Sequence, residues 1–123
     1  MRERVLSLSA VALLAACASS GVDVMPEPQL LEEARAKLAA GELSRAIACS
    51  EAVIERSNES VRKQEALYLA GEAQFADEAW VKAFEHYQTL LHDYPYSQFV
   101  PKIEEHPFAI GVEYLSREPW IFV

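Results

Sequence analysis

Several features that indicate common classes of protein are scarce in this 123-residue chain. Two cysteines are too few for a small domain stapled by disulfides. Four glycines and six prolines leave little room for the turns of an all-β fold. Lysine and arginine number 11 against 19 aspartates and glutamates, and this excess of negative charge argues against binding nucleic acid, or anionic lipid through charge. What remains, 51% hydrophobic and 24% charged residues, is the composition of one small globular domain.

The chain also lacks a hydrophobic run long enough to cross a bilayer. Its uncharged apolar stretch, Val5 to Ala16, has 12 residues, whereas a membrane-spanning helix needs about 20. Arg2 and Arg4 precede this stretch and small residues close it, as in a secretory signal peptide. Residues 1–16 are therefore predicted to be a signal peptide. An amphipathic start that is not cleaved is the alternative.

The end of this stretch, residues 14–17 (LAAC), resembles the lipobox of bacterial lipoproteins. The resemblance implies that the thiol of Cys17 carries a diacylglycerol and that its amino group takes a further acyl chain. Several chains anchor a protein firmly, because each buried CH₂ contributes about 0.8 kcal/mol. A plain secretory signal that happens to contain a cysteine is the alternative. By resemblance to enterobacterial lipoproteins, Ala18 and Ser19 after the cysteine favour the outer membrane, with the protein facing the periplasm.

Residues 18–28 are small, polar and proline-bearing, without a period. We expect residues 17–28 to comprise the lipidated cysteine and a flexible tether between lipid and domain. From Gln29 onward the apolar residues recur at helical spacing, and no alternating run of convincing length indicates a strand. The sequence therefore predicts an all-α domain over residues 29–116, followed by an apolar tail over residues 117–123.

Five helices are expected, at about Pro28–Ala40, Leu43–Arg56, Ser60–Ala76, Ala79–Asp93 and Pro101–Leu115. Gly41 suits the left-handed residue that ends a helix, and Tyr94-Pro95 ends the fourth helix. Ser60 or Asn58 is expected to cap the third helix, and Pro107 to kink or split the fifth. The fourth helix is predicted to face inward through Trp80, Ala83, Phe84, Tyr87, Leu90 and Leu91.

Helical pairs joined by short turns invite a search for internal repeats. A shift of 37 residues aligns the first pair with the second, matching Leu30 with Leu67, Ala36 with Ala73, Ala39 with Ala76 and Ala46 with Ala83. A further shift of 40 residues sets Ala70-Gly71 against Ile110-Gly111. The chain thus contains about two and a half copies of one helical hairpin.

The second copy resembles a tetratricopeptide repeat. The family pattern is W-x₂-L-G-x₂-Y, then A-x₃-F, then P, and this chain has Leu67-x-x-Ala70-Gly71, Phe75, Ala83-x-x-x-Tyr87 and Pro95. Gly71 and Ala83 are expected where the two helices cross, because larger side chains would push them apart. The resemblance implies tetratricopeptide-like hairpins stacked in a right-handed α-solenoid.

The segment from residue 83 to residue 101, with its Tyr94-Pro95-Tyr96-Ser97 turn, is similar to the repeats of BamD-like outer-membrane lipoproteins. That family pairs such a turn with a lipobox. It carries about five repeats, whereas this sequence stops after the first helix of a third, and an array needs about three repeats to bury a continuous core. Three alternatives follow: residues 120–123 fold back on the last helices, the chain is a shortened relative, or a partner covers its end.

In tetratricopeptide arrays the first helix of each hairpin lines a concave groove that takes an extended or helical segment. Carried over to this sequence, the groove residues are Leu31, Arg35, Leu38, Glu65, Tyr68, Glu72, Phe75, Phe108, Val112 and Leu115. Glu65 and Glu72 would favour a basic or neutral segment. Packing in the core is the alternative for Tyr68 and Phe75.

Catalytic and metal-binding patterns are missing from the sequence. The histidines, His86, His92 and His106, form no H-E-x-x-H motif and no i, i+4 pair. Adjacent carboxylates such as Glu104-Glu105 point apart on a helix and cannot flank one substrate bond. Cys49 lies among apolar residues and is expected to be a buried structural thiol. We therefore expect no enzyme, no metal site and no cofactor.

The sequence thus predicts a lipid-anchored periplasmic scaffold for protein–protein interactions. By resemblance to the BamD-like family, its role is the assembly of β-barrel proteins into the outer membrane. Its partner is then an envelope protein or peptide segment, such as part of the barrel-assembly machinery, and not a nucleic acid. The alternatives are an adaptor for peptidoglycan or secretion machinery and the non-catalytic part of an envelope enzyme.

Overall fold

The computed structural model describes residues 20–106. These residues form a short 3-10 helix, η1 (Val22–Val24), and five α-helices, and they contain no strand. The α-helices are α2 (Glu27–Ala40), α3 (Leu43–Arg56), α4 (Ser60–Ala76), α5 (Trp80–Asp93) and α6 (Val100–Glu104). The all-α fold that the sequence predicts is confirmed, and α3 and α4 have the predicted bounds.

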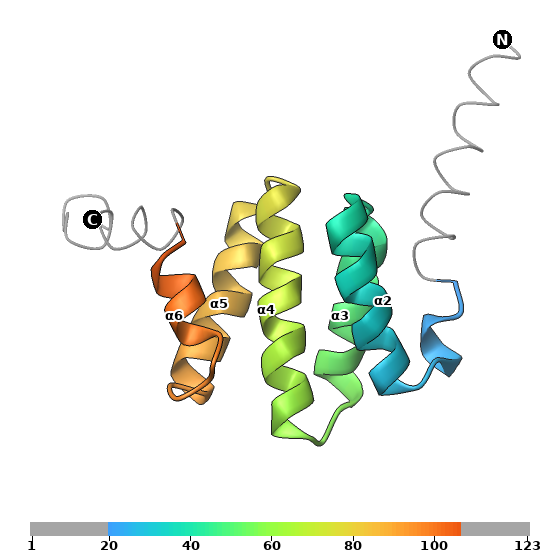
Figure 1. The fold of residues 1–123 in the computed structure, drawn as a ribbon, viewed down its shortest axis with the longest axis horizontal. Helices are drawn as coiled ribbons and strands as arrows, with labels where there is room; N and C mark the ends of the chain where they lie inside the picture. Colours follow the sequence, from blue (N-terminus) through green and yellow to red (C-terminus); the bar gives the residue numbers. More distant parts are fainter. Residues whose placement is uncertain (1–19, 107–123) are drawn as a thin grey trace, which may run out of the picture.

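The helices form antiparallel hairpins arranged in a row (Figure 1). α2 packs against α3 and α4 against α5, while α4 also packs against α3 and α2, so the two hairpins lie side by side. η1 and α6 lie at opposite ends of the row. Both bounds of α5 come 37 residues after those of α3. This spacing equals the shift that aligns the two halves of the sequence.

The end of α2 and the start of α4 follow from local turn chemistry. Gly41 ends α2 with a φ of 78°, a left-handed conformation that glycine adopts without strain. The N-cap of α4 is Glu59, in place of the expected Ser60 or Asn58, and no side chain caps this helix. The buried Ser57 explains the difference, because its Oγ accepts a hydrogen bond from the N–H of Glu59 at 3.2 Å. Ser57 therefore stabilises the turn that precedes α4 and does not act as the side-chain cap of that helix.

Within the described residues α6 is short, and it ends near the proline at which the sequence predicts a kink or a split. Pro101 lies in its first turn. A backbone N–H at this position has no partner within the helix, so the missing N–H of proline costs no hydrogen bond there. The helix stops at Glu104, three residues before Pro107. A proline disfavours helical backbone at the residue before it, which explains a helix end near this point. The expected continuation to Leu115 lies outside the described residues.

Within residues 20–106 the buried hydrophobic side chains form two clusters, one between α2, α3 and α4 and one between α4, α5 and α6. The first contains Val22, Leu30, Leu31, Ala34, Cys49, Val53, Ala66 and Leu69. The second contains Leu67, Ala83, Tyr87, Leu90 and Ile103. Cys49 is fully buried, as expected, and burial raises the pKa of its thiol. Trp80 and Leu91, expected to face inward, are 48% and 36% exposed, because α6 has five residues and covers little of α5.

Gly71 sets the distance between α4 and α5. The ring of Tyr87 lies directly against it, so that a Cβ at position 71 would come 2.7 Å from Cδ1 and 2.9 Å from Cζ of that ring. Both distances are far shorter than van der Waals contact. Ala83 is fully buried in the same hairpin. The structure therefore confirms that a small residue is required at Gly71.

Residues 20–28 make fixed contacts that the flexible tether expected over residues 18–28 would lack, whereas residues 17–19 lie outside the described part of the chain. Val22 is 5% exposed and belongs to the first core cluster. Arg56 donates hydrogen bonds to the carbonyls of Asp23 and Met25, at 2.9 and 2.7 Å. Residues 27 and 28 form the first turn of α2. One buried valine and one guanidinium thus hold a segment that shows no periodic pattern in the sequence.

Candidate functional site

The neighbouring helices α2 and α4 present charged side chains on one face. Arg35 of α2 forms an ion pair with Glu65 of α4. The two side chains remain 54% and 23% exposed, so solvent weakens this pair. Its value is geometric, since it places two of the predicted groove residues together on a surface shared by both helices.

Tyr68 lies one turn after Glu65 on α4 and connects this face to α6. Its ring stacks on the ring of Phe99, with centroids 4.8 Å apart and an interplanar angle of 19°. The Nζ of Lys102 lies 5.6 Å from the centroid of Tyr68 and 5.4 Å from that of Phe99, which suits a cation–π contact. Burial raises the pKa of Tyr68, and the charge of Glu72 adds to this effect. Half-buried Tyr68 thus contributes to packing and to the surface.

Glu72 has its partners within the chain. It accepts a hydrogen bond from the hydroxyl of Tyr87 at 2.6 Å, and Nε2 of His106 lies 3.5 Å from the same carboxylate oxygen. Burial is the main cause of a raised pKa at Tyr87, and the hydrogen bond to Glu72 is the second. Glu65 is likewise paired, with Arg35. These intrachain contacts weaken the attraction that both glutamates were expected to exert on a basic segment.

Three other predicted groove residues pack within the chain. Leu31 is 4% exposed in the first core cluster, which corrects its placement in the groove. Leu38 packs against the same cluster. The reason is that α2 is covered by both α3 and α4, so its apolar stripe turns inward. Phe75 packs edge-on against the rings of Trp80 and His106, with ring centroids 5.1 and 4.2 Å apart. It packs against the second core cluster, which agrees with the alternative that Phe75 is a core residue.

Phe108, Val112, Leu115 and the predicted lipidation site Cys17 lie outside the described residues. Sequence reasoning missed Phe99 and Lys102, which contact Tyr68, and His106, which contacts Phe75 and lies beside Glu72. A partial signal for two of them was present, because Phe99 and Lys102 are three residues apart and flank the predicted helix start at Pro101, and this is the spacing of side-chain neighbours on a helix. The surface formed by Arg35, Glu65, Tyr68 and Lys102, joined through Phe99, is called the docking face below.

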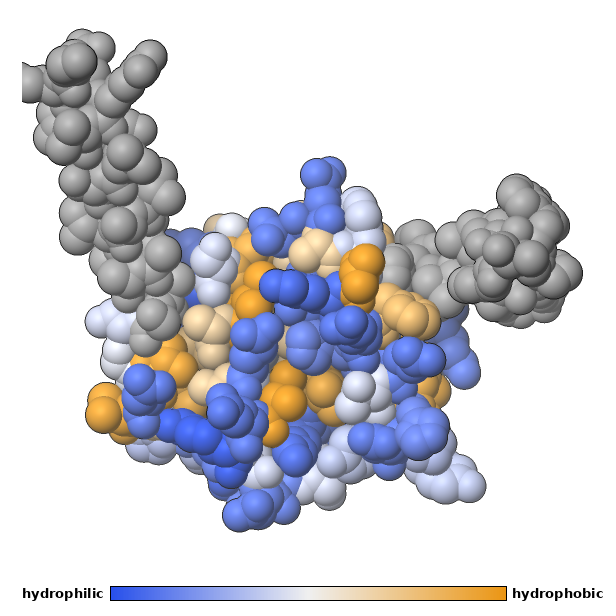
Figure 2. All heavy atoms as spheres, turned by 180° about the vertical axis from the view of Figure 1, so that it is seen from behind, coloured by the Kyte–Doolittle hydropathy of each residue, from blue (hydrophilic) through white to orange (hydrophobic). Residues whose placement is uncertain are grey.

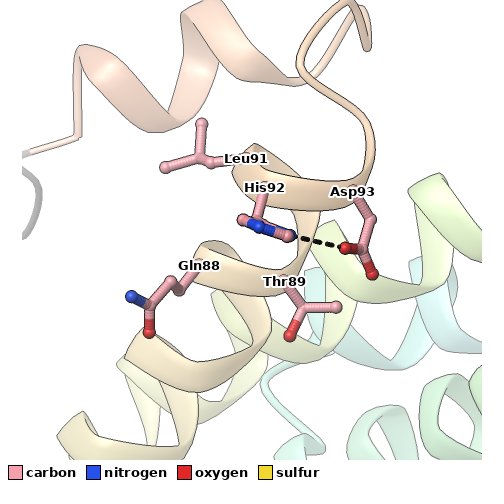
Figure 3. A pocket seen from close by; sticks show the side chains of 5 residues that line it. All are labelled: Gln88, Thr89, Leu91, His92 and Asp93. Atoms are coloured by element: carbon pink, nitrogen blue, oxygen red, sulfur yellow. Dashed lines mark hydrogen bonds and ion pairs between the residues drawn. The ribbon is translucent and has the colours of Figure 1, made fainter.

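The side of the molecule opposite to the view of Figure 1 carries both hydrophobic and hydrophilic residues. Figure 2 shows hydrophobic patches on it that are separated by hydrophilic side chains. At the end of α5, a hollow of about 480 Å³ is lined by Gln88, Thr89, Leu91, His92 and Asp93 (Figure 3). Nδ1 of His92 lies 2.8 Å from Oδ1 of Asp93, and the histidine side chain is 85% exposed. Water therefore has free access to the ionisable groups of this hollow.

Two further kinds of feature are missing from residues 20–106. No group of three or more histidine, cysteine, aspartate or glutamate side chains there is arranged to hold a metal ion. No helix in the same range combines the length and the hydrophobicity that a bilayer crossing requires.

No protein-family model, no curated protein and no solved structure matches the chain. What the chain does is therefore inferred from its own residues.

Proposed function

We propose that the chain is a lipid-anchored scaffold for protein–protein interactions, built from tetratricopeptide-like hairpins in a right-handed α-solenoid and similar to BamD-like lipoproteins. It lies on the periplasmic side of the outer membrane and takes part in the assembly of β-barrel proteins. It acts by binding and not by catalysis. The observation that carries the proposal is the docking face, on which α2 and α4 lie side by side with charged and aromatic side chains at the surface.

The hairpins support the tetratricopeptide part of the proposal in two ways. α3 and α5 occupy equivalent positions in the 37-residue register, and Gly71 allows the close crossing at which that family places small residues. The turn after α5 also gives its serine a role. Ser97 is 8% exposed, and its Oγ accepts a hydrogen bond from the N–H of Phe99 at 3.3 Å. Ser97 thereby fixes the start of the next helix.

The docking face combines features that suit a segment of another protein. Tyr68 offers a large, rigid contact surface at low entropic cost. Lys102 and the pair formed by Arg35 and Glu65 offer both signs of charge beside it. An extended or helical segment with an apolar anchor flanked by charged residues matches this arrangement.

The anchoring part rests on residues 14–17 and is tested separately. Radiolabelled palmitate is expected to label the wild type and not Cys17→Ala. Equal labelling of both proteins, or none of either, contradicts the anchor.

The docking part is tested by affinity capture of the acylated protein from membranes dissolved in mild detergent. The wild type is expected to recover an outer-membrane assembly protein, and Arg35→Ala with Tyr68→Ala to recover much less. Tyr96→Ala is the matched control, because Tyr96 is 99% exposed and lies outside the docking face. Recovery of peptidoglycan or secretion proteins supports the alternative adaptor. Recovery of no envelope protein contradicts the proposal.

A further inference from the structure

The segment that follows Cys17 is fastened to α3 by two arginines. Nη1 of Arg45 donates to the carbonyl of Ser20, and Arg56 donates to the carbonyls of Val22, Asp23 and Met25. The two arginines are eleven residues apart, about three turns of helix, so they project from the same side of α3. Residues 20–25, held in this way, are called the strap.

Other contacts fix the strap and its arginines. Gly21 has a φ of 75°, which turns the chain into η1. Val22 then enters the first core cluster at 5% exposure. Nε of Arg45 lies 2.8 Å from Oε1 of Glu33, and these side chains are only 15% and 24% exposed. The guanidinium is therefore oriented by an ion pair while it binds the strap.

The strap shortens the distance between the anchor and the domain. Only Ala18 and Ser19 separate Cys17 from Ser20. A residue spans at most about 3.6 Å, so Cys17 lies within about 11 Å of Ser20 whatever conformation these residues take. A free tether ending at Pro28 would extend to about 40 Å by the same arithmetic.

We propose that the strap holds the first hairpin, α2 and α3, directly against the bilayer surface. This inference rests on the proposed acylation of Cys17. Val24 is 86% exposed on the strap and supplies an apolar side chain for the lipid interface. η1 and α6 lie at opposite ends of the row of helices (Figure 1). The α2–α3 hairpin is therefore the end at the membrane, and the α6 end projects away from it.

The test uses the acylated full chain in vesicles of phosphatidylethanolamine and phosphatidylglycerol. A fluorophore is attached to a single free thiol, introduced as Glu55→Cys beside Arg56 or as Tyr96→Cys near α6, in a Cys49→Ala background in which Cys17 is acylated. Quenching by lipids that carry a nitroxide near the headgroup is expected to be severalfold stronger at position 55 than at position 96. Equal quenching at the two positions in acylated, vesicle-bound protein overturns the proposal.

Two changes separate the strap from the anchor itself. Arg56→Ala, or ten Gly/Ser residues inserted between Ser19 and Ser20, is expected to reduce quenching at position 55. Lys82→Ala, which removes an exposed cation of α5 outside both the strap and the docking face, is the matched control and is expected to leave it unchanged. If the insertion leaves quenching at position 55 unchanged, the claim that a short connection to Cys17 holds the hairpin at the bilayer is contradicted.

Mass spectrometry of the same samples tells the two possible failures apart. A chain without acyl groups at Cys17 overturns the proposed function and this inference with it. An acylated chain in which the amide hydrogens of Val24 and Met25 exchange as fast as in Arg56→Ala overturns the strap alone. Slow exchange in the wild type and fast exchange in the variant support it.

Discussion

The two hairpins fill equivalent positions with different pairs of side chains. In the 37-residue register, Ala34 and Ser50 of the first hairpin correspond to Gly71 and Tyr87 of the second. The first pair is fully buried and small. In the second, the missing side chain of Gly71 makes room for the ring of Tyr87. The side-chain volume that α4 lacks at Gly71 is thus filled by the ring of Tyr87 from α5.

Each hairpin also satisfies the polar atom that its pair brings into the interior. Ser50 donates to the carbonyl of Ala46 at 2.8 Å, within its own helix. Tyr87 donates to Glu72 on the neighbouring helix at 2.6 Å. Buried hydroxyls need such partners. The contrast teaches that the pair is the unit of packing, and that the second hairpin depends on its pair more than the first.

The largest effect is expected from Tyr87→Ala. Removing this ring leaves a cavity beside Gly71 and should lower the free energy of unfolding by about 3–5 kcal/mol. Urea denaturation followed by circular dichroism measures it. Tyr96→Ala, at a fully exposed tyrosine, should change stability by less than about 0.5 kcal/mol. A similar cost at both positions would show that Tyr87 is not the centre of the second hairpin.

Gly71→Ala is expected to cost about 1–3 kcal/mol, because its new methyl group overlaps the ring of Tyr87. In a Tyr87→Ala background the same change should cost nothing, since the methyl group then has space. The double-mutant cycle therefore measures the coupling within the pair. Additive losses would contradict the claim that the pair acts as a unit.

A smaller, pH-dependent effect on the free energy of unfolding is expected from the ion pair between Glu27 of the first hairpin and Arg62 of the second. Oε2 of Glu27 lies 3.0 Å from Nη1 of Arg62. Hydrogen bonds from Arg62 first, and from Ser57 second, lower the pKa of Glu27 below its ordinary value of 4.5. The ionised carboxylate therefore stabilises the fold above pH 4.5, and this contribution is lost as the pH falls through the lowered pKa.

Glu27→Gln should accordingly be less stable than the wild type at pH 7, and the difference should vanish in acid. Urea titrations at pH 7 and pH 3 test this, with Glu55→Gln, at an exposed position, as the control. A difference that persists unchanged at pH 3 argues against the ion pair as its source.

The smallest effect is expected from Ser50→Ala in the first hairpin. The hydroxyl bonds only within its own helix, so its removal should change the free energy of unfolding by less than about 0.5 kcal/mol. The same denaturation assay measures it. A loss close to that of Tyr87→Ala would remove the distinction between the two hairpins.

Much of the fold was predictable because the helix ends carry local signals. Gly41 ends α2, and the apolar period defines α3 and α4 up to their observed bounds. The need for a small residue at Gly71 was also readable, since the repeat alignment and the family pattern agree there. These features depend on neighbours close in sequence, which sequence reasoning treats well.

The remainder depends on which surfaces cover one another. The strap was missed because Arg56 binds backbone carbonyls, which leave no mark in the pattern of side chains. Leu31 was assigned to the groove because a family register does not give the rotation of α2 under two covering helices. Trp80 and Leu91 fit an inward stripe that α6 is too short to cover.

Photo-cross-linking in intact cells tests the central claim, that the docking face takes an envelope protein. Benzoylphenylalanine is placed at Arg35 on that face and, as the matched position, at Gln88 in the hollow of α5 (Figure 3). Position 35 is expected to yield an adduct with one envelope protein, and position 88 none. Adducts from position 88 alone, or from neither position in acylated, membrane-bound protein, would contradict the account.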